Sequence, residues 1–228
     1  MSLRTKVYLL QMKKYFVKTP WLVKKLWPSY VWHIDTKEKI LYLSFDDGPH
    51  PEVTPFVLEA LKKYNAKASF FCIGKNVVAF PGLYQQILSE GHAAGNHTQD
   101  HLNGWKTKNG VYLKNVMQAA IHIDSALFRP PYGRIKSSQA RNIAGALQKK
   151  NAKIIMWTVL SGDFDTTISS EKCLQNVIGS AHPGAIIVFH DSAKAFTRLQ
   201  YTLPRVLEFF SERGYLFEGI SMPLAGKI

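Results

Sequence analysis

From residue 40 onward, the sequence alternates short apolar runs with segments of helical periodicity. β-Branched and aromatic runs predict strands near residues 40–45, 67–72, 92–95, 126–129, 153–159, 185–189 and 215–219. Helical patterns lie between them, near residues 55–64, 82–90, 110–125, 137–150, 170–181 and 198–212. Such alternation predicts a parallel sheet with helical crossovers. About seven strand–helix units suit either an incomplete barrel or a doubly wound open sheet, and the alternation alone leaves both open.

The length and composition are those of a globular domain. The chain has 228 residues, 46% of them apolar, which suits one domain with a sizeable core and excludes a disordered chain. No apolar run approaches the roughly 18 residues of a membrane-spanning helix. Cys72 lies in the apolar run "ASFFCIG" and Cys173 in a predicted helix, so we interpret both as core residues rather than as a disulfide or a zinc-thiolate site.

The net charge of +13 raises the question of a polyanionic partner. The lysines and arginines are scattered, as in "LKKYNAK" and "LQKKNAK", and no recognition helix, RRM or zinc-finger pattern is present. We therefore expect no nucleic-acid partner, while an anionic polymer or membrane surface stays open.

Residues 1–35 differ from the rest and are predicted to form a helical extension of a domain that spans residues 36–228. The segment mixes lysines with aromatic residues, namely Lys13, Lys14, Lys18, Lys24 and Lys25 among Tyr15, Phe16, Trp21 and Trp27. Either residues 1–30 contact a membrane surface peripherally, or the segment packs under the domain with its lysines in water. It lacks the continuous apolar region and cleavage site of a signal peptide, so we expect a cytoplasmic or membrane-peripheral location.

Polar side chains gather where the predicted strands end. The first strand ends in "SFDDGP", and later strands run into "NHTQDH", "RPPYG", "SGDFD" and "FHD". Because the carboxyl ends of parallel strands meet at one face, we expect these groups to share one cleft although they span nearly 150 residues.

Two histidines and two aspartates in these motifs suggest a metal site. His97 and His101 are four residues apart and would share one face of a helical turn. Two imidazoles and a carboxylate suit a divalent metal such as zinc. Asp46 and Asp47 could form an ordinary turn, but a pair with one carboxylate on a cation and the other as a base explains why both are acidic.

Arg129 and His190 are further candidates at strand ends. Arg129 precedes Pro130-Pro131 and would orient a carboxylate through bidentate hydrogen bonds, unless it is an ordinary surface arginine. His190 follows the apolar run "AIIVF" and would act as a general acid, unless it is a core histidine with one hydrogen-bond partner.

These motifs, in this order, resemble the NodB-homology polysaccharide deacetylases, carbohydrate esterase family 4, over roughly residues 38–220. The family motifs T/S-F-D-D-G-P, H-S/T-x-x-H and R-x-P-Y-G stand here as "SFDDGP", "HTQDH" and "RPPYG", and its final motif stands as "VFH". The resemblance implies an irregular (β/α)7 barrel, similar to a TIM barrel. The predicted N-terminal helical extension lies outside the resemblance.

The resemblance also implies roles for the motif residues. Asp46 matches the base that activates the attacking water, and Arg129 matches the arginine that holds this base. Asp47, His97 and His101 match the metal ligands.

Further matches concern proton transfer to the leaving group. His190 matches the general acid and Asp163 the carboxylate that tunes it. Tyr132 matches the residue whose backbone N–H helps to bind the oxyanion.

The fourth motif departs from the family pattern W-x-x-D-x-x-D-W. In "WTVLSGDF", Leu160 replaces the first aspartate and Phe164 replaces the final tryptophan. Trp157, Phe164 and Val188 are expected to contact substrate, and the departures change the expected pocket wall.

The implied activity is metal-dependent removal of N-acetyl groups from N-acetylhexosamine units of a peptidoglycan- or chitin-like saccharide. The implied cofactor is a divalent metal, with zinc expected before cobalt or another ion. Alternatives are an O-acetyl esterase acting on a xylan-type polymer, the same chemistry on a non-sugar amide, a catalytically silent carbohydrate-binding homologue, and a nucleic-acid or membrane adaptor. The oligomeric state is not indicated. The location is left open, because the family acts mostly on cell-wall polymers outside the membrane, whereas no export signal is visible in this sequence.

Overall fold

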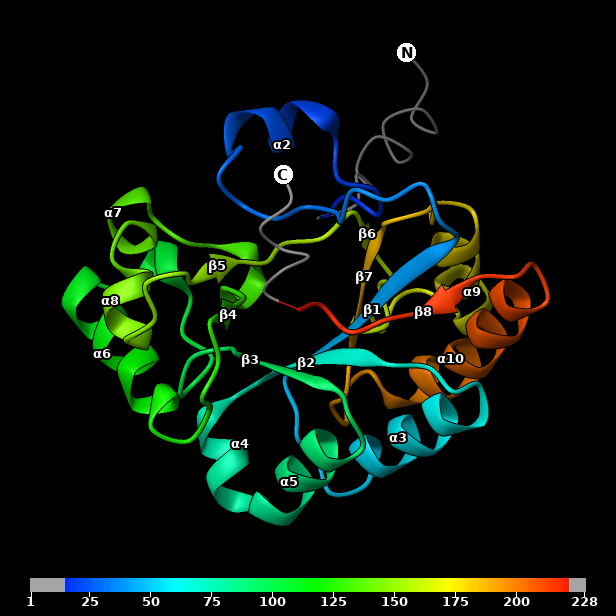
Figure 1. The fold of residues 1–228 in the computed structure, drawn as a ribbon, viewed down its shortest axis with the longest axis horizontal. Coiled ribbons are helices and arrows are strands. Elements are labelled where there is room, and N and C mark those ends of the chain that lie inside the picture. The colour runs from blue at the N-terminus through cyan, green and yellow to red at the C-terminus, as the bar shows by residue number, and fades with distance from the viewer. Residues whose placement is uncertain (1–14, 222–228) are drawn as a thin grey trace, which may run out of the picture.

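A computed structural model describes residues 15–221, and its centre is a parallel sheet curled into an open barrel (Figure 1). Seven strands follow one path in the order β5-β4-β3-β2-β1-β7-β6, and β8 pairs with the first residues of β1. The strands are β1 (Ile40–Asp46), β2 (Ala68–Cys72), β3 (Ala93–Asn96), β4 (Leu127–Phe128), β5 (Lys153–Ile154), β6 (Val159–Leu160), β7 (Ile186–His190) and β8 (Leu216–Phe217). This arrangement confirms the predicted irregular (β/α)7 barrel.

Most helices surround the sheet on its outer side, while α2 (Trp21–Leu26) lies apart at the top of Figure 1. The surrounding helices are α3 (Val53–Lys63), α4 (Gly74–Ala79), α5 (Pro81–Ser89), α6 (Asn109–Ala120), α7 (Ser137–Ala140), α8 (Ile143–Leu147), α9 (Ser170–Ile178) and α10 (Phe196–Ser211). Short 3-10 turns occupy Gly104–Lys106 and Pro131–Gly133. None of the helices in the described part of the chain combines the length and apolar character needed to cross a bilayer.

Strand β1 lies at the centre of the sheet and separates core from site. Its odd-numbered side chains pack into the core under the outer helices, where the Phe45 ring stacks on Phe70 at 5.1 Å and on Phe189 at 5.9 Å. Because side chains alternate along a strand, Ser44 and Asp46 point to the barrel interior instead. The apolar pattern of β1 therefore fixes which way its terminal carboxylate faces.

The barrel is open between β5 and β6, and residues 15–35 run along this opening. Val31 bridges Ile155 in parallel and Lys18 bridges Val159 in antiparallel orientation. The N–H of Thr19 donates to the carbonyl of Thr158 at 2.9 Å, which adds a further backbone link. The N-terminal segment is thus hydrogen-bonded to the barrel edge.

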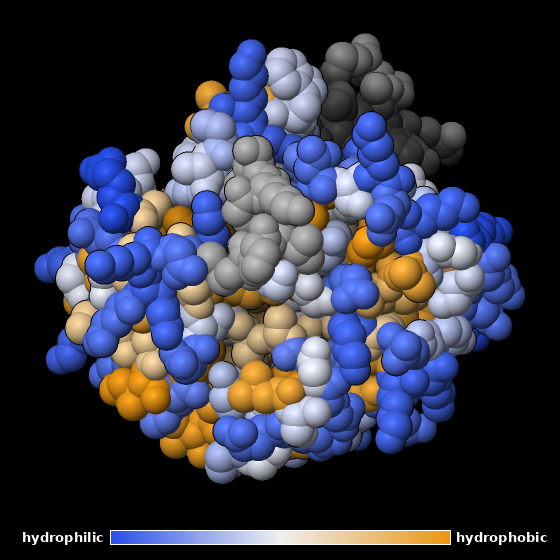
Figure 2. Space-filling view, viewed as in Figure 1, coloured by the Kyte–Doolittle hydropathy of each residue, from blue (hydrophilic) through white to orange (hydrophobic). Residues whose placement is uncertain are grey.

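Within the described part of the segment that was predicted to be helical, only α2 is a helix, and the other residues are extended or in turns. Residues 1–14 of that prediction lie outside the described residues. Figure 2 shows hydrophilic side chains spread over the visible face of the barrel rather than gathered in one patch, as the scattered lysines predicted.

The predicted elements hold with three differences. Helix α4 was not predicted from the sequence, and residues 137–150 form two short helices, α7 and α8, rather than one. The run predicted as one strand, residues 153–159, divides into the end strands β5 and β6. The N–H of Val31 donates to the carbonyl of Ile154 and the N–H of Met156 donates to the carbonyl of Val31, whereas the N–H of Thr158 donates to the carbonyl of Ile186 in β7. The cysteines Cys72 and Cys173 are buried free thiols, as expected for core residues.

Candidate active site

A cleft of about 540 Å³ opens at the carboxyl ends of the strands. Nine of the eleven residues predicted for the site line it, namely Asp46, Asp47, His97, His101, Tyr132, Trp157, Phe164, Val188 and His190. The other two, Arg129 and Asp163, are fully buried behind the wall. The expected convergence of the strand ends on one cleft is therefore observed.

Asp47, His97 and His101 form a compact cluster at one end of the cleft. One side-chain donor atom from each lies within 4.8 Å of the others. The Oδ1 atom of Asp47 is 3.1 Å from Nε2 of His101 and 3.7 Å from Nε2 of His97. The predicted helical turn between the histidines is wrong, because Thr98 and His101 have φ angles of 66° and 57° and the segment is a loop.

The donor chemistry of this cluster fits a divalent cation. Oδ1 of Asp47 and Nε2 of His97 are buried without a hydrogen bond, which is rare for buried polar atoms unless an ion or water satisfies them. Nδ1 of His97 lies 2.7 Å from the carbonyl oxygen of Arg129 and so must carry the proton. The lone pair of Nε2 is then directed into the cluster, as in histidines that bind metals.

The protonation states fit the same ion. Burial lowers the pKa of His97 to about 4, so its ring is neutral at neutral pH. Burial by itself would raise the pKa of Asp47, but His101 and the neighbouring histidines His190 and His97 hold it well below the usual value. A carboxylate beside neutral imidazole is the donor set that a dication requires.

Asp46 is held by a fully buried arginine. Nη1 of Arg129 lies 2.6 Å from Oδ1 of Asp46 and donates to Oγ of Ser44 at 2.8 Å. The remaining guanidinium donors reach the carbonyl oxygens of Ile155 and Met156, each at 3.1 Å. This burial excludes the interpretation of Arg129 as a surface residue, and its fixed fork sets the orientation of the Asp46 carboxylate.

His190 is held by Asp163 on the opposite side of the cleft. Nδ1 of His190 is 2.8 Å from Oδ1 of Asp163, and the backbone N–H of His190 donates to Oδ2 at 2.7 Å. Burial would lower the pKa of His190, but Asp163 raises it to about 9. The ring is therefore an imidazolium at neutral pH, which is the state of a proton donor.

Aromatic side chains form the wall beside His190. Phe164 packs edge-on against His190 at 5.1 Å and lies tilted against Tyr15 at 5.0 Å between ring centroids. The Tyr15 hydroxyl donates to Asp165 at 2.9 Å, which ties the N-terminal segment to the loop that follows β6. Leu160 also lines the cleft, so the wall is apolar where the family pattern has a carboxylate.

Three residues that help to build the site were not predicted from the sequence. The alternation of β1 could have identified Ser44, which shares the face of Asp46. Asp191 follows His190 directly and accepts hydrogen bonds from the N–H of Gly48 at 2.9 Å and from Thr54 at 2.6 Å, which fixes the loop that carries Asp47. Tyr15 carries no sequence signal, because its contacts lie about 150 residues further along the chain.

Fold and site together define a class of protein, an α/β-barrel hydrolase. Its cleft joins a carboxylate–imidazole cluster that can hold one divalent cation to a second carboxylate held by arginine and a histidine held by aspartate. Residues 33–152 match the family model described as polysaccharide deacetylase. The chain belongs to the polysaccharide deacetylase family, which confirms the resemblance predicted from the motifs.

Individual relatives agree with this family. The chain is 31% identical over 208 residues to a peptidoglycan-N-acetylglucosamine deacetylase of Bacillus cereus, covering 88% of this chain and 96% of the relative. It is 32% identical over 167 residues to a chitooligosaccharide deacetylase of Azorhizobium caulinodans, covering 69% and 76% of the two chains. Several other curated relatives are longer, and the chain spans 37 to 55% of their length.

A solved structure agrees with the fold at a TM-score of 0.78 and 28% identity, covering 89% of this chain and 95% of the other. It is the Bc1960 peptidoglycan N-acetylglucosamine deacetylase in complex with 4-naphthalen-1-yl-N-oxidanyl-benzamide.

Proposed function

We propose that the protein removes N-acetyl groups from N-acetylglucosamine units by metal-dependent hydrolysis. The observation that carries the proposal is the convergence of three held groups in one cleft. These are the Asp47–His97–His101 cluster, the Asp46 carboxylate fixed by Arg129, and the His190 imidazolium fixed by Asp163. The relatives named as peptidoglycan and chitooligosaccharide deacetylases support N-acetylglucosamine as the acetylated unit.

Asp47, His97 and His101 would hold the metal. Zinc is the expected ion, because two histidines and one carboxylate are a common ligand set for catalytic zinc. When bound, the cation supplies Lewis-acid polarisation of the acetyl carbonyl and lowers the pKa of a water molecule.

Asp46 would serve as the general base. Its Oδ1 atom is engaged by Arg129, which leaves Oδ2 to accept the proton of the attacking water. Because the guanidinium has four fixed hydrogen-bond partners, it keeps the carboxylate in one orientation. A positioned base of this kind contributes about 10²–10⁴-fold to the rate.

His190 would protonate the leaving amine. Asp163 engages Nδ1, so the proton on Nε2 is the one available to the cleft. An amine leaves only after it gains a proton, and the pKa of about 9 keeps His190 charged at neutral pH. The backbone N–H of Tyr132, at a residue with φ of 61°, would donate to the oxyanion, a contribution of roughly 3–4 kcal/mol.

The complete set of base, metal cluster and acid favours an enzyme over a silent carbohydrate-binding homologue. The same groups could also hydrolyse an O-acetyl ester, so the test below includes substrates with N-acetyl and with O-acetyl groups. Membrane contact through residues 1–30 stays a prediction, supported by α2, which exposes Trp21, Leu22 and Leu26 beside Lys25.

The direct test is acetate release from peptidoglycan fragments, chitooligosaccharides and acetylated xylan, each with and without a chelator. We expect release from the N-acetylglucosamine substrates, loss with chelator, and recovery when zinc or cobalt is restored. If acetate is released from acetylated xylan alone, the protein is an O-acetyl esterase. If no substrate releases acetate, the proposal is contradicted.

A further inference from the structure

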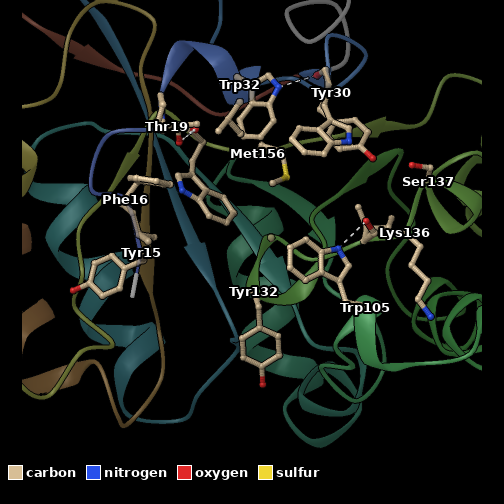
Figure 3. Close-up of a pocket in the computed structure, with 17 residues that line it drawn as sticks. Tyr15, Phe16, Thr19, Tyr30, Trp32, Trp105, Tyr132, Lys136, Ser137 and Met156 are labelled. Carbon is tan, nitrogen blue, oxygen red and sulfur yellow. Dashed lines mark hydrogen bonds between the residues drawn. The ribbon is translucent and has the colours of Figure 1, made fainter. Parts of the chain in front are cut away.

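A second cavity of about 610 Å³ lies beside the active-site cleft (Figure 3). Its walls come from residues 15–32 on one side and from the loops at the carboxyl ends of the strands on the other. It shares five lining residues with the cleft, namely Tyr15, Tyr132, Gly133, Trp157 and Leu160. The cavity, here named the aromatic groove, is therefore continuous with the place where an acetyl group would react.

The walls of the aromatic groove are strongly apolar. Four of the five tryptophans of the chain line it, namely Trp27, Trp32, Trp105 and Trp157. Figure 3 places the side chains of Tyr30, Trp32, Trp105 and Met156 around the same space. A volume of this size lies in the range of pockets that hold a drug-sized ligand or a lipid chain.

Several polar groups of the lining are already bonded within the protein. The indole N–H of Trp32 donates to the carbonyl of Trp27 at 3.0 Å, and that of Trp105 donates to Ile135 at 3.2 Å. The Thr19 hydroxyl donates to Trp157 at 2.8 Å, and Nζ of Lys136 donates to Thr107 at 2.8 Å. The two indole N–H groups and the Thr19 hydroxyl proton are therefore not free to bind a ligand, whereas the Lys136 ammonium keeps two further N–H donors.

Apolar walls with few free hydrogen-bond donors favour a hydrocarbon over a saccharide as the ligand of the groove. A sugar ring can stack on indole, but its hydroxyl groups lose hydrogen bonds to water and need partners in the site. A hydrocarbon chain needs none and gains free energy from each methylene that leaves water. The aromatic groove therefore suits an alkyl or isoprenoid chain better than a further sugar.

The departures in the fourth motif fit the same occupant. Leu160 lies where the cleft meets the aromatic groove, and it is apolar where the family pattern has an aspartate. A carboxylate there would put a charge on the path from the metal cluster to the groove. Leu160 makes that path apolar.

The position of α2 gives the groove a route to lipid. Pro20, Val23 and Trp27 of this region line the groove, while Trp21, Leu22 and Leu26 are exposed to solvent. An exposed apolar surface on the element that forms the groove wall suits a substrate presented by a lipid surface.

We propose that the aromatic groove binds the hydrocarbon chain of an amphiphilic substrate, an N-acetylated sugar joined to a lipid chain. The sugar would lie at the metal cluster and the chain would run along the walls formed by residues 15–32. This inference rests on the proposed deacetylase function and names the class of substrate for it.

The test compares methyl, butyl and octyl glycosides of N-acetylglucosamine with chitotetraose, all below micellar concentration. We expect kcat/KM to rise at least about tenfold from methyl to octyl, within a ceiling of roughly fourfold for each methylene buried. A kcat/KM that is equal for methyl and octyl glycosides while chitotetraose is preferred would assign the groove to sugar and overturn the proposal.

Matched variants tie the effect to the groove. Val23→Asp places a charge in the wall and should bring the octyl-to-methyl ratio close to one, while Val23→Leu should keep it high. Ile121→Asp is the control, because Ile121 is 77% exposed and lies outside the groove, and its ratio should equal that of the parent protein. Equal ratios in the parent and Val23→Asp would contradict the assignment.

A binding measurement separates the two proposals. Octyl glucoside with a bromine on its terminal carbon has no acetyl group and quenches nearby tryptophans. We expect saturable quenching in the parent and its loss in Val23→Asp. Quenching without acetate release from any substrate would contradict the proposed deacetylase function but support hydrocarbon binding in the aromatic groove. Acetate release without quenching would contradict hydrocarbon binding in the groove.

Discussion

His190 is bonded twice to Asp163, through its ring Nδ1 at 2.8 Å and through its own backbone N–H at 2.7 Å. The two bonds engage both carboxylate oxygens, so Asp163 sets the position of the ring as well as its charge. Because Asp163 has no solvent exposure, its effect on the pKa of His190 is not screened by water.

We expect the alkaline limb of the pH–rate profile to report His190. A general acid must be protonated, so activity should fall as the pH rises through its pKa of about 9. In Asp163→Asn the main cause of the raised pKa is gone and burial lowers it, so the limb should move to lower pH. The measurement is kcat/KM against pH.

Asp165→Asn is the control for this shift, since Asp165 bonds to Tyr15 and Thr167 rather than to His190. Its alkaline limb should coincide with that of the parent. If the alkaline limb of Asp163→Asn coincides with that of the parent, His190 is not the general acid.

Arg129→Met should destabilise the fold strongly, because it leaves the buried Asp46 carboxylate without its partner. Breaking a buried ion pair from one side costs about 3–5 kcal/mol in the free energy of unfolding. Arg129→Lys keeps the charge but loses the planar fork that reaches Ile155 and Met156. Its free energy of unfolding should therefore lie between those of the parent and Arg129→Met.

Urea denaturation of Asp46→Asn, of Arg129→Met and of the double variant Asp46→Asn/Arg129→Met measures the energetic coupling between Asp46 and Arg129. The double variant should lose less stability than the sum of the single losses. Additive losses would mean that the pair does not act as a unit.

His97→Ala should lose the bound metal. Replacing even a residue outside the ligand shell weakens metal binding by about 10–100-fold, and loss of a ligand should exceed that. Metal content by mass spectrometry after dialysis is the readout. His122→Ala, at an exposed histidine outside the cluster, should retain the metal content of the parent, and equal content in both variants would contradict the assigned site.

Gly48→Ala should destabilise the loop that carries Asp47. A Cβ atom at this position would overlap with Oδ2 of Asp191, which is held by Thr54 and cannot withdraw easily. Overpacking of this kind costs about 1–3 kcal/mol in the free energy of unfolding.

Gly110→Ala is the matched control for this change, because a Cβ atom at this position in α6 would meet nothing within 4 Å apart from the backbone of its own helix and its chain neighbours. It should stabilise the protein by up to about 1 kcal/mol. Equal effects of the two changes on the urea midpoint would contradict the packing argument.

The part of the site that the sequence predicts is the part placed by strand ends. Asp46, His97 and His190 each follow an apolar strand, and the geometry of a parallel sheet brings such residues together whatever their distance in sequence. The loop conformation between His97 and His101 was not predictable, since the positive φ angles there follow from tertiary contacts rather than from residue type.

The remainder depends on contacts that leave no local pattern. The six residues of α4 are too few to show a helical period. Val31 pairs with Ile155 across the barrel opening, and no motif in residues 15–35 indicates that partner. The aromatic groove therefore appears only when the N-terminal segment is seen against the barrel.

The most direct test of the mechanism is Asp46→Asn assayed for metal content and acetate release together. Asparagine keeps the size of the side chain but cannot accept the proton of the attacking water. We predict that metal content stays at the parent level while kcat falls by about 10²–10⁴-fold. Near-parental activity in Asp46→Asn would contradict the assignment of Asp46 as the base.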